Sequence, residues 1–128
     1  MKRLLLDTHV FLWWLVNDQR LGERARGFIQ DPKNQIFVSA ATTWEISIKR
    51  ALGKISAPED MSSIIDDEGF IALSINAYHA DQAGLLPDLH NDPFDRMLIA
   101  QAQSEGLVLV TADEKIFKYP LRIIKANE

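Results

Sequence analysis

The sequence has 128 residues, 47% of them hydrophobic, which is enough for one ordinary domain with a packed core. It contains no cysteine, so disulfides and thiolate zinc sites are excluded, and any metal must bind to oxygen or imidazole. A formal net charge of -4 argues against a protein that grips nucleic acid over its whole surface.

The first half of the chain alternates short apolar runs with helical patterns. A buried strand is predicted at Arg3–Leu6, followed by a largely buried helix over Val10–Val16. A second helix covers Glu23–Gln30 and ends before the turn sequence Asp-Pro-Lys-Asn. The β-branched and aromatic run Ile36–Ser39 predicts another strand, which leads into a helix over about Ala41–Leu52.

The second half continues this alternation. Its predicted segments are, in chain order, a short helix within Ala57–Gly69, a strand within Phe70–Ile75, a helix within Asn76–Leu86, a helix over Pro93–Glu105, a strand at Leu107–Val110 and an edge strand at Arg122–Ile124. Strands separated by helices imply crossover connections and therefore a mainly parallel sheet covered on both faces. We predict an α/β sandwich with four or five strands.

Neither composition nor hydropathy indicates a domain boundary or a membrane-spanning segment in this sequence. No repeat, linker or low-complexity tract is visible, so we expect one domain over residues 1–128. The N-terminus has a positive start and apolar runs, but Asp7 and His9 interrupt them and no cleavage pattern follows, unlike a signal peptide. No run approaches the roughly 18 apolar residues that span a bilayer. We expect a cytoplasmic protein.

Four acidic residues are expected at one edge of this sheet, because ligands in such folds collect beyond the carboxyl ends of the strands. Asp7 directly follows the first strand, and Asp113 comes shortly after the strand Leu107–Val110. Glu45 lies early in the helix after the second strand, and Asp95 lies in the first turn of its helix. All four side chains are therefore predicted to project from the same end of the molecule.

Each acid also has a purely structural interpretation. Asp7 would cap the following helix, and Asp113 would form a turn. Glu45 would pair with Lys49 at i, i+4 on a helix surface. Asp95 would serve the helix dipole behind an N-cap at Asp92. These interpretations do not explain why Asp95 lies over the apolar stripe of its helix.

Crowded carboxylates require a positive partner. At about 4 Å and an effective dielectric constant of ~20, each like-charged pair repels by roughly 4 kcal/mol. With oxygen ligands, a hard divalent cation such as Mg2+ or Mn2+ fits best. A carboxylate-held cation suits phosphodiester hydrolysis, whereas a glycosidase needs only two acids and no metal.

Four sequence strings together resemble the PIN domain, and within it the VapC-type toxins of bacterial toxin–antitoxin pairs. They are LLLDTH, SAATTWEISIK, LHNDPFDRMLIAQA and LVLVTADE. The resemblance runs from Asp7 to Asp113, and its most specific part is the string H-x-D-P-F-D-R. It implies a PIN-like α/β/α sandwich, a metal-dependent ribonuclease, a homodimer, and a small cognate VapB-type antitoxin that blocks the active site.

The resemblance also implies roles for particular residues. The catalytic acids are Asp7, Glu45, Asp95 and Asp113, with Asp7, Asp95 and Asp113 as metal ligands. Thr111 supplies a hydroxyl that steadies water on the ion or an acidic neighbour. Asp92, as the N-cap, fixes the helix that presents Asp95.

Several other side chains have more than one interpretation. The candidate phosphate contacts, each of which is also interpretable as a solvated surface cation, are Lys49, Arg50, Lys54, Arg96 and Lys115. The histidines His9, His79 and His90 are left out of the catalytic set, and His90 is as well explained by bonds to its own loop. Trp13 and Trp14 point about 100° apart on a helix, so either one of them belongs to a subunit or antitoxin interface or both lie in a thick hydrophobic layer.

Two other classes of function stay open. An Asp directly after a first strand is also typical of phosphoaspartyl enzymes, although His9 stands where a phosphatase of the haloacid-dehalogenase type carries its second Asp. Alternatively, the acids keep a non-catalytic binding module soluble. An effect of millimolar Mg2+ on the melting temperature separates a metal site from a simple module.

Overall fold

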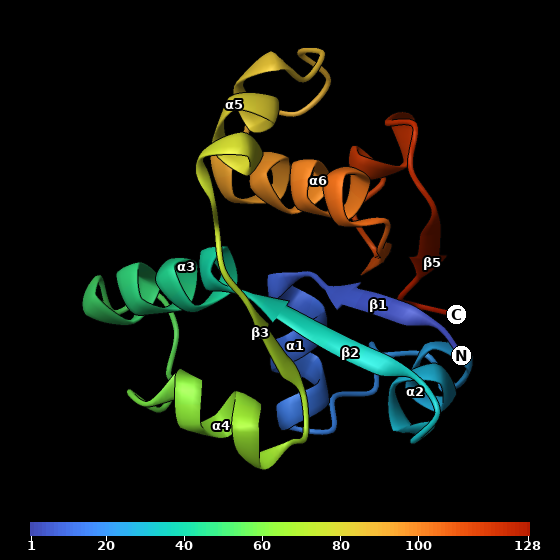
Figure 1. The fold of residues 1–128 in the computed structure, drawn as a ribbon. Coiled ribbons are helices and arrows are strands. Elements are labelled where there is room, and N and C mark those ends of the chain that lie inside the picture. Colours follow the sequence, from blue (N-terminus) through green and yellow to red (C-terminus); the bar gives the residue numbers. More distant parts are fainter.

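The computed structural model describes residues 1–128 and contains a five-stranded sheet in which all neighbouring strands run parallel. The strand order across the sheet is β3-β2-β1-β4-β5 (Figure 1). The strands are β1 (Arg3–Leu6), β2 (Gln35–Ser39), β3 (Ile71–Leu73), β4 (Val108–Thr111) and β5 (Ile123–Lys125). The prediction of a parallel α/β sandwich is confirmed.

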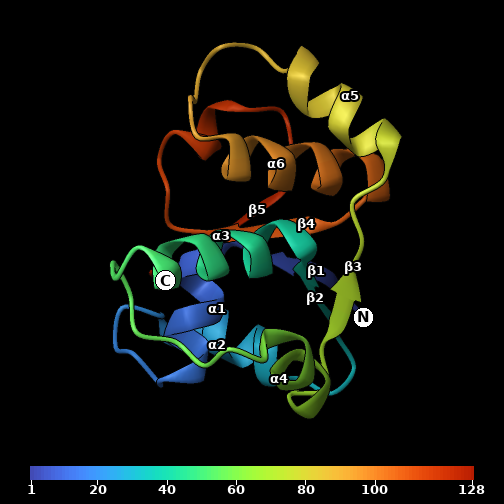
Figure 2. The same ribbon diagram turned by 90° about the vertical axis from the view of Figure 1, so that its left-hand side faces the viewer.

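Helices cover both faces of the sheet. They are α1 (Thr8–Leu15), α2 (Glu23–Gln30), α3 (Ala40–Ala51), α4 (Met61–Asp67), α5 (Ala77–Leu85) and α6 (Pro93–Glu105), with a short 3-10 turn η1 (Ile116–Lys118). Figure 2 shows α1, α2 and α4 on one side, and α6 with α5 stacked outside it on the other. None of these helices combines the length and the apolarity that a membrane crossing requires.

The central strand β1 shows how the sequence builds two cores. Alternate side chains of a strand point to opposite faces of the sheet. Leu4 and Leu6 accordingly join the cluster under α1, α2 and α4, whereas Leu5 joins the cluster under α6. All three are fully buried, as expected for a parallel strand covered on both sides. Packing on both faces therefore fixes β1 in place, and with it the position of Asp7, the residue that follows it.

Helix boundaries follow their capping residues. Asp7 accepts a hydrogen bond from the backbone N–H of Val10, so α1 begins two residues before the predicted start. Asp92 caps α6, Pro93 occupies its first turn, and Gly106 ends it in the left-handed conformation with a φ of 67°. The predicted bounds of α6 are confirmed.

The strands other than β1 differ from the prediction, and one of them is the central strand β4, which lies one residue later than Leu107–Val110. β3 comprises only three of the six residues in Phe70–Ile75, because the chain leaves the sheet to reach Asn76, the N-cap of α5. β5 lies one residue later than Arg122–Ile124, in register with β4. Edge strands pair on one side only, so their lengths depend on the turns around them.

Candidate active site

The carboxyl ends of the three central strands bring the predicted acids to one edge of the sheet. Asp7 follows β1, and Asp113 comes two residues after β4. Glu45 lies in the second turn of α3, which follows β2 directly, and Asp95 lies in the first turn of α6. Since β2, β1 and β4 are adjacent, segments up to 104 residues apart in the chain meet at this edge.

Asp7 is buried and firmly held, with 4% of its surface exposed. One carboxylate oxygen accepts the Val10 N–H at 2.8 Å, and the other accepts the Thr111 hydroxyl at 2.5 Å. Burial is the main cause that raises the pKa of Asp7; the charge of Asp113 adds to it and the two hydrogen bonds oppose it. The capping interpretation and the placement at the acidic edge are therefore both correct for this residue.

The pKa of Asp95 reflects both its burial and the negative charges around it. Burial is the largest cause that raises the pKa of its carboxyl to about 7. The charges of Asp92, Asp7 and Asp113 act in the same direction, and His90 acts against them. Asp92 fixes this arrangement because its side chain accepts the N–H groups of both Phe94 and Asp95, at 2.8 and 3.1 Å.

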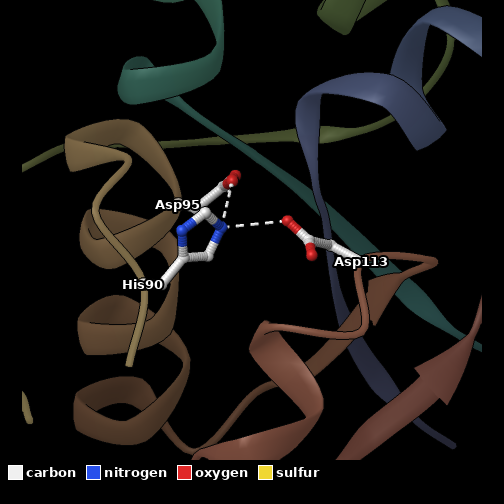
Figure 3. Close-up of side chains that lie close together, drawn as sticks. All are labelled: His90, Asp95 and Asp113. Atoms are coloured by element: carbon white, nitrogen blue, oxygen red, sulfur yellow. Dashed lines mark hydrogen bonds and ion pairs between the residues drawn. The ribbon is translucent and has the colours of Figure 1, made fainter. Parts of the chain in front are cut away.

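His90 lies between two of the acids, a position that the sequence did not reveal. Its Nε2 is 2.9 Å from Asp95 Oδ2 and 2.9 Å from Asp113 Oδ2 (Figure 3). Its Nδ1 accepts the backbone N–H of Asp92 at 3.3 Å, which puts the proton of a neutral imidazole on Nε2, facing the carboxylates. The only hint in the sequence is its place two residues before Asp92. The ring bonds to its own loop, as considered above, and also to the acidic cluster.

Glu45 is buried beside the cluster, and both of its oxygens have partners. Oε1 accepts the Thr8 hydroxyl at 2.6 Å, and Oε2 pairs with Lys49 Nζ at 2.6 Å. The hydrogen bond to Glu45 is the main cause that raises the pKa of Lys49, and the charges of Asp92 and Asp95 contribute. Lys49 therefore faces the acidic edge, and Thr8 is a further contact that no local sequence pattern indicated.

The other basic residues predicted to contact RNA lie either in hydrogen bonds to the protein's own backbone or on its surface. Arg96 donates to the backbone carbonyls of Ala83, Leu86, Pro87 and His90 at 2.9 to 3.2 Å, so it ties the end of α5 and the following loop to α6. Arg50 donates to the Pro58 carbonyl at 3.0 Å. Lys54 and Lys115 are exposed. The structure thus gives Arg96 a role inside the protein and leaves the two lysines on the surface.

The donor set fits a divalent cation. One ligand atom each from His90, Asp95 and Asp113 lies within 4.8 Å of the others. Asp7 is outside this trio, although its charge acts on Asp95. Carboxylate oxygens are the ligands that Mg2+ and Mn2+ prefer, so Asp95 and Asp113 are suitable ligands for such an ion.

Comparison with known families identifies the fold. The family model of the PIN domain matches residues 4–120. The chain belongs to the PIN domain family. The resemblance drawn from the four sequence strings is thereby confirmed, and the acidic cluster lies within the matched region of this PIN domain.

Individual relatives extend this result. The chain is similar to ribonuclease VapC22 of Mycobacterium tuberculosis, with 29% identity over 119 residues that make up 91% of each chain. It is 40% identical over 58 residues to ribonuclease VapC16 of the same organism, a match that covers 42% of this chain and 41% of that protein. A toxin–antitoxin complex from Klebsiella pneumoniae contains the same fold, with a TM-score of 0.63, 20% identity and coverage of 95% of this chain and 96% of that one.

Proposed function

We propose that the protein is a VapC-type, metal-dependent endoribonuclease, the toxin of a toxin–antitoxin pair, and that it hydrolyses RNA phosphodiester bonds at its acidic cluster. The observation that carries this proposal is the convergence of Asp95 and Asp113 on His90, with Asp7 and Asp113 lining one cavity, at one edge of a PIN-domain sheet. The relatives named as VapC ribonucleases supply the class of substrate. We further propose that residues 1–128 act as one PIN domain.

Mg2+ is the proposed cofactor, and Mn2+ is the alternative. Asp7, Asp95 and Asp113 would hold it, and His90 is within reach through its contacts to the last two. A bound divalent ion supplies positive charge that activates a water molecule and stabilises the departing oxygen. The excess of carboxylates over cationic partners at this edge supports a cation as the missing counter-charge.

The surrounding residues orient these ligands. Thr111 donates to Asp7 and restricts its carboxylate to one position. Asp92 fixes the first turn of α6 and thereby the direction of Asp95. Glu45 is the fourth proposed catalytic acid, and in the free protein Lys49 neutralises its charge. Metal sites with such supporting hydrogen bonds keep their ligands in the reactive geometry.

The remaining partners belong to the same proposal. Lys49, Arg50 and Lys115 are proposed contacts to RNA phosphates, whereas Arg96 acts by holding the loop that carries His90. A VapB-type antitoxin is the proposed protein partner, by analogy with the toxin–antitoxin complex of the same fold. A homodimer and a cytoplasmic location complete the proposal, and the exposed side chains of Trp44, Tyr78 and Leu85 favour an interface.

RNA cleavage tests this function. The purified protein is expected to cut single-stranded RNA with Mg2+ or Mn2+, to lose this activity on chelation, and to regain it when the metal is restored. Asp95→Asn should abolish cleavage at an unchanged or higher melting temperature, because it removes a ligand but no packing volume. The matched control is Asp81→Asn, which changes an exposed carboxylate on α5. Equal cleavage by parent and Asp95→Asn would contradict the proposal.

A further inference from the structure

A cavity of about 320 Å3 opens directly beside the acidic cluster. Its walls are formed by Asp7, His9, Trp13, Arg20, Ala112 and Asp113. Two of these residues belong to the proposed metal site, and three others carry flat side chains. The cavity therefore has a charged wall and a planar wall within the same small volume.

The planar wall is formed by three neighbouring groups. The ring centroids of His9 and Trp13 are 6.3 Å apart and their planes are inclined by 45°, so each presents its own flat face rather than a common plane. The guanidinium carbon of Arg20 lies 5.2 Å from the centre of the Trp13 ring. The next residue, Trp14, points elsewhere, with its ring 5.9 Å from Phe70. Both tryptophans pack against the core under α1, α2 and α4, but of the two only Trp13 lines the cavity.

The chain holds Arg20 in place over Trp13. After α1 the backbone turns at Asn17, which has a φ of 53°, and the N–H of Asp18 bonds to the Trp13 carbonyl at 2.9 Å. Asp18 then accepts two hydrogen bonds from the Arg20 guanidinium, at 2.7 and 3.1 Å. The planar wall is therefore formed before any ligand binds, and the charge of Arg20 is largely balanced by Asp18.

We propose that His9, Trp13 and Arg20 bind one nucleobase of the RNA, on a nucleotide that flanks the cleaved bond. This inference rests on the proposed ribonuclease function. Proteins recognise single-stranded RNA by stacking unpaired bases on aromatic rings and arginine planes. The shared walls at Asp7 and Asp113 bring a base in the cavity next to a phosphate at the acidic cluster.

Base stacking also explains how a protein with a negative net charge can bind RNA. The 14 basic side chains are outnumbered by 18 acidic ones, so the protein has no excess of positive charge with which to hold a phosphate backbone. A base-binding cavity supplies affinity that does not depend on phosphate contacts. A larger cavity of about 600 Å3 shares the same three residues and continues along α1 toward α4, which gives the neighbouring nucleotide room to leave the site.

The experiment measures coupling between Trp13 and the base. The probe is a labelled single-stranded RNA of about 12 nucleotides around a mapped cleavage site, together with the same RNA made abasic at each flanking position in turn. Loss of one stacked base corresponds to a roughly fivefold to 150-fold increase in KM. Trp13→Leu should raise KM within this range on intact RNA with little change in kcat, and Trp13→Phe should raise it less.

On one of the two abasic RNAs, the parent and Trp13→Leu should have the same KM, because the partner of Trp13 is gone. Trp14→Phe is the matched control and should leave KM unchanged on every RNA. If Trp13→Leu does not fold, Arg20→Gln replaces it in the test, because Arg20 is exposed and its substitution leaves the core unchanged. Arg20→Gln should raise KM on the intact RNA but not on the abasic RNA that lacks the stacked base.

The opposite results have distinct meanings. An active parent whose KM is unaffected by Trp13→Leu, or equally affected on intact and both abasic RNAs, overturns the base site and leaves the ribonuclease function standing. The base site is also overturned if Trp13→Leu cleaves RNA like the parent but no longer binds a partner protein. The cavity would then be a protein-docking surface. A parent that cuts no RNA with Mg2+ or Mn2+ removes both proposals together.

Discussion

Two buried histidines near opposite ends of α6 show how similar residues serve different purposes. His79 has 1% of its surface exposed and His90 has 7%. His79 joins α5 to α6: its Nδ1 accepts the Asn76 N–H at 3.2 Å, and its Nε2 lies 3.1 Å from Glu105 Oε2. Its neighbour Gln101 is bonded in turn to Ser39 at 2.6 Å. Donors and acceptors match one another throughout this network.

The region around His90 is not balanced in this way. One imidazole faces the carboxylates of Asp95 and Asp113, and the pKa of Asp95 is about 7. A neutral imidazole has a single proton on Nε2, so it satisfies only one of these acceptors fully at a time. The difference teaches that a matched polar network holds helices together, whereas an excess of carboxylates indicates a site for a cation.

Replacing each histidine by alanine should separate these two roles, and within this comparison it should give the largest effect. His90→Ala removes a group that positions two proposed ligands, so cleavage should fall about tenfold to a hundredfold and half-maximal activity should need more Mg2+. His79→Ala should leave cleavage unchanged at 25 °C but lower the free energy of unfolding by about 1–3 kcal/mol, because buried partners lose their hydrogen bonds.

Steady-state cleavage over a range of Mg2+ concentrations and urea unfolding measure the two effects. His90→Gln serves as the conservative variant, since its amide still donates a hydrogen bond, and it should recover part of the Mg2+ affinity. The same loss of activity in both alanine variants would remove the distinction between the two regions.

The pH dependence of stability gives a smaller and complementary effect. The pKa of Asp95 is about 7 in the folded protein, against an ordinary value of 3.8. Between these values the folded protein keeps a proton that the unfolded chain has released. Without metal, the free energy of unfolding should therefore fall as pH rises from about 4 to 7, by about 4 kcal/mol, and then level off.

Asp95→Asn should remove most of this slope, whereas Asp81→Asn should keep it. Protons and Mg2+ compete for the same carboxylate, so the Mg2+-induced rise in melting temperature should grow with pH up to about 7 and then remain constant. Thermal unfolding at several pH values, with and without millimolar Mg2+, measures both slopes. Parallel curves for the parent and Asp95→Asn would show that this carboxyl is not the titrating group.

Local chemistry explains which parts of the fold were predictable. The bounds of α2 and α6 were predicted to the residue, and those of α6 follow from Asp92, Pro93 and Gly106, which act on their own neighbours in the chain. β3 was predicted too long, because an alternating pattern does not reveal where the chain leaves an edge of the sheet. The order and type of the elements could therefore be predicted from local signals, whereas the end of the edge strand β3 could not.

The residues of the site also differ in whether the sequence could predict them. The placement of Asp7, Glu45 and Asp113 followed from one topological rule, that residues after parallel strands gather at one edge, and Asp95 joins them because it lies in the first turn of the helix that leads into β4. The contacts of His90 with Asp113 and of Thr8 with Glu45 join residues 23 and 37 positions apart, and no periodicity encodes them. Arg96 illustrates the reverse case, since its charge suggested RNA and its hydrogen bonds go to the protein's own backbone.

A crystal structure with Mn2+ tests the central claim most directly, since anomalous scattering locates this ion without reference to activity. The account predicts one or more Mn2+ peaks among Asp7, Asp95 and Asp113, within coordination distance of their carboxylates, and no such peak in Asp95→Asn crystals at the same concentration. A parent crystal with no peak at this edge, or with Mn2+ bound only elsewhere on the molecule, would contradict it.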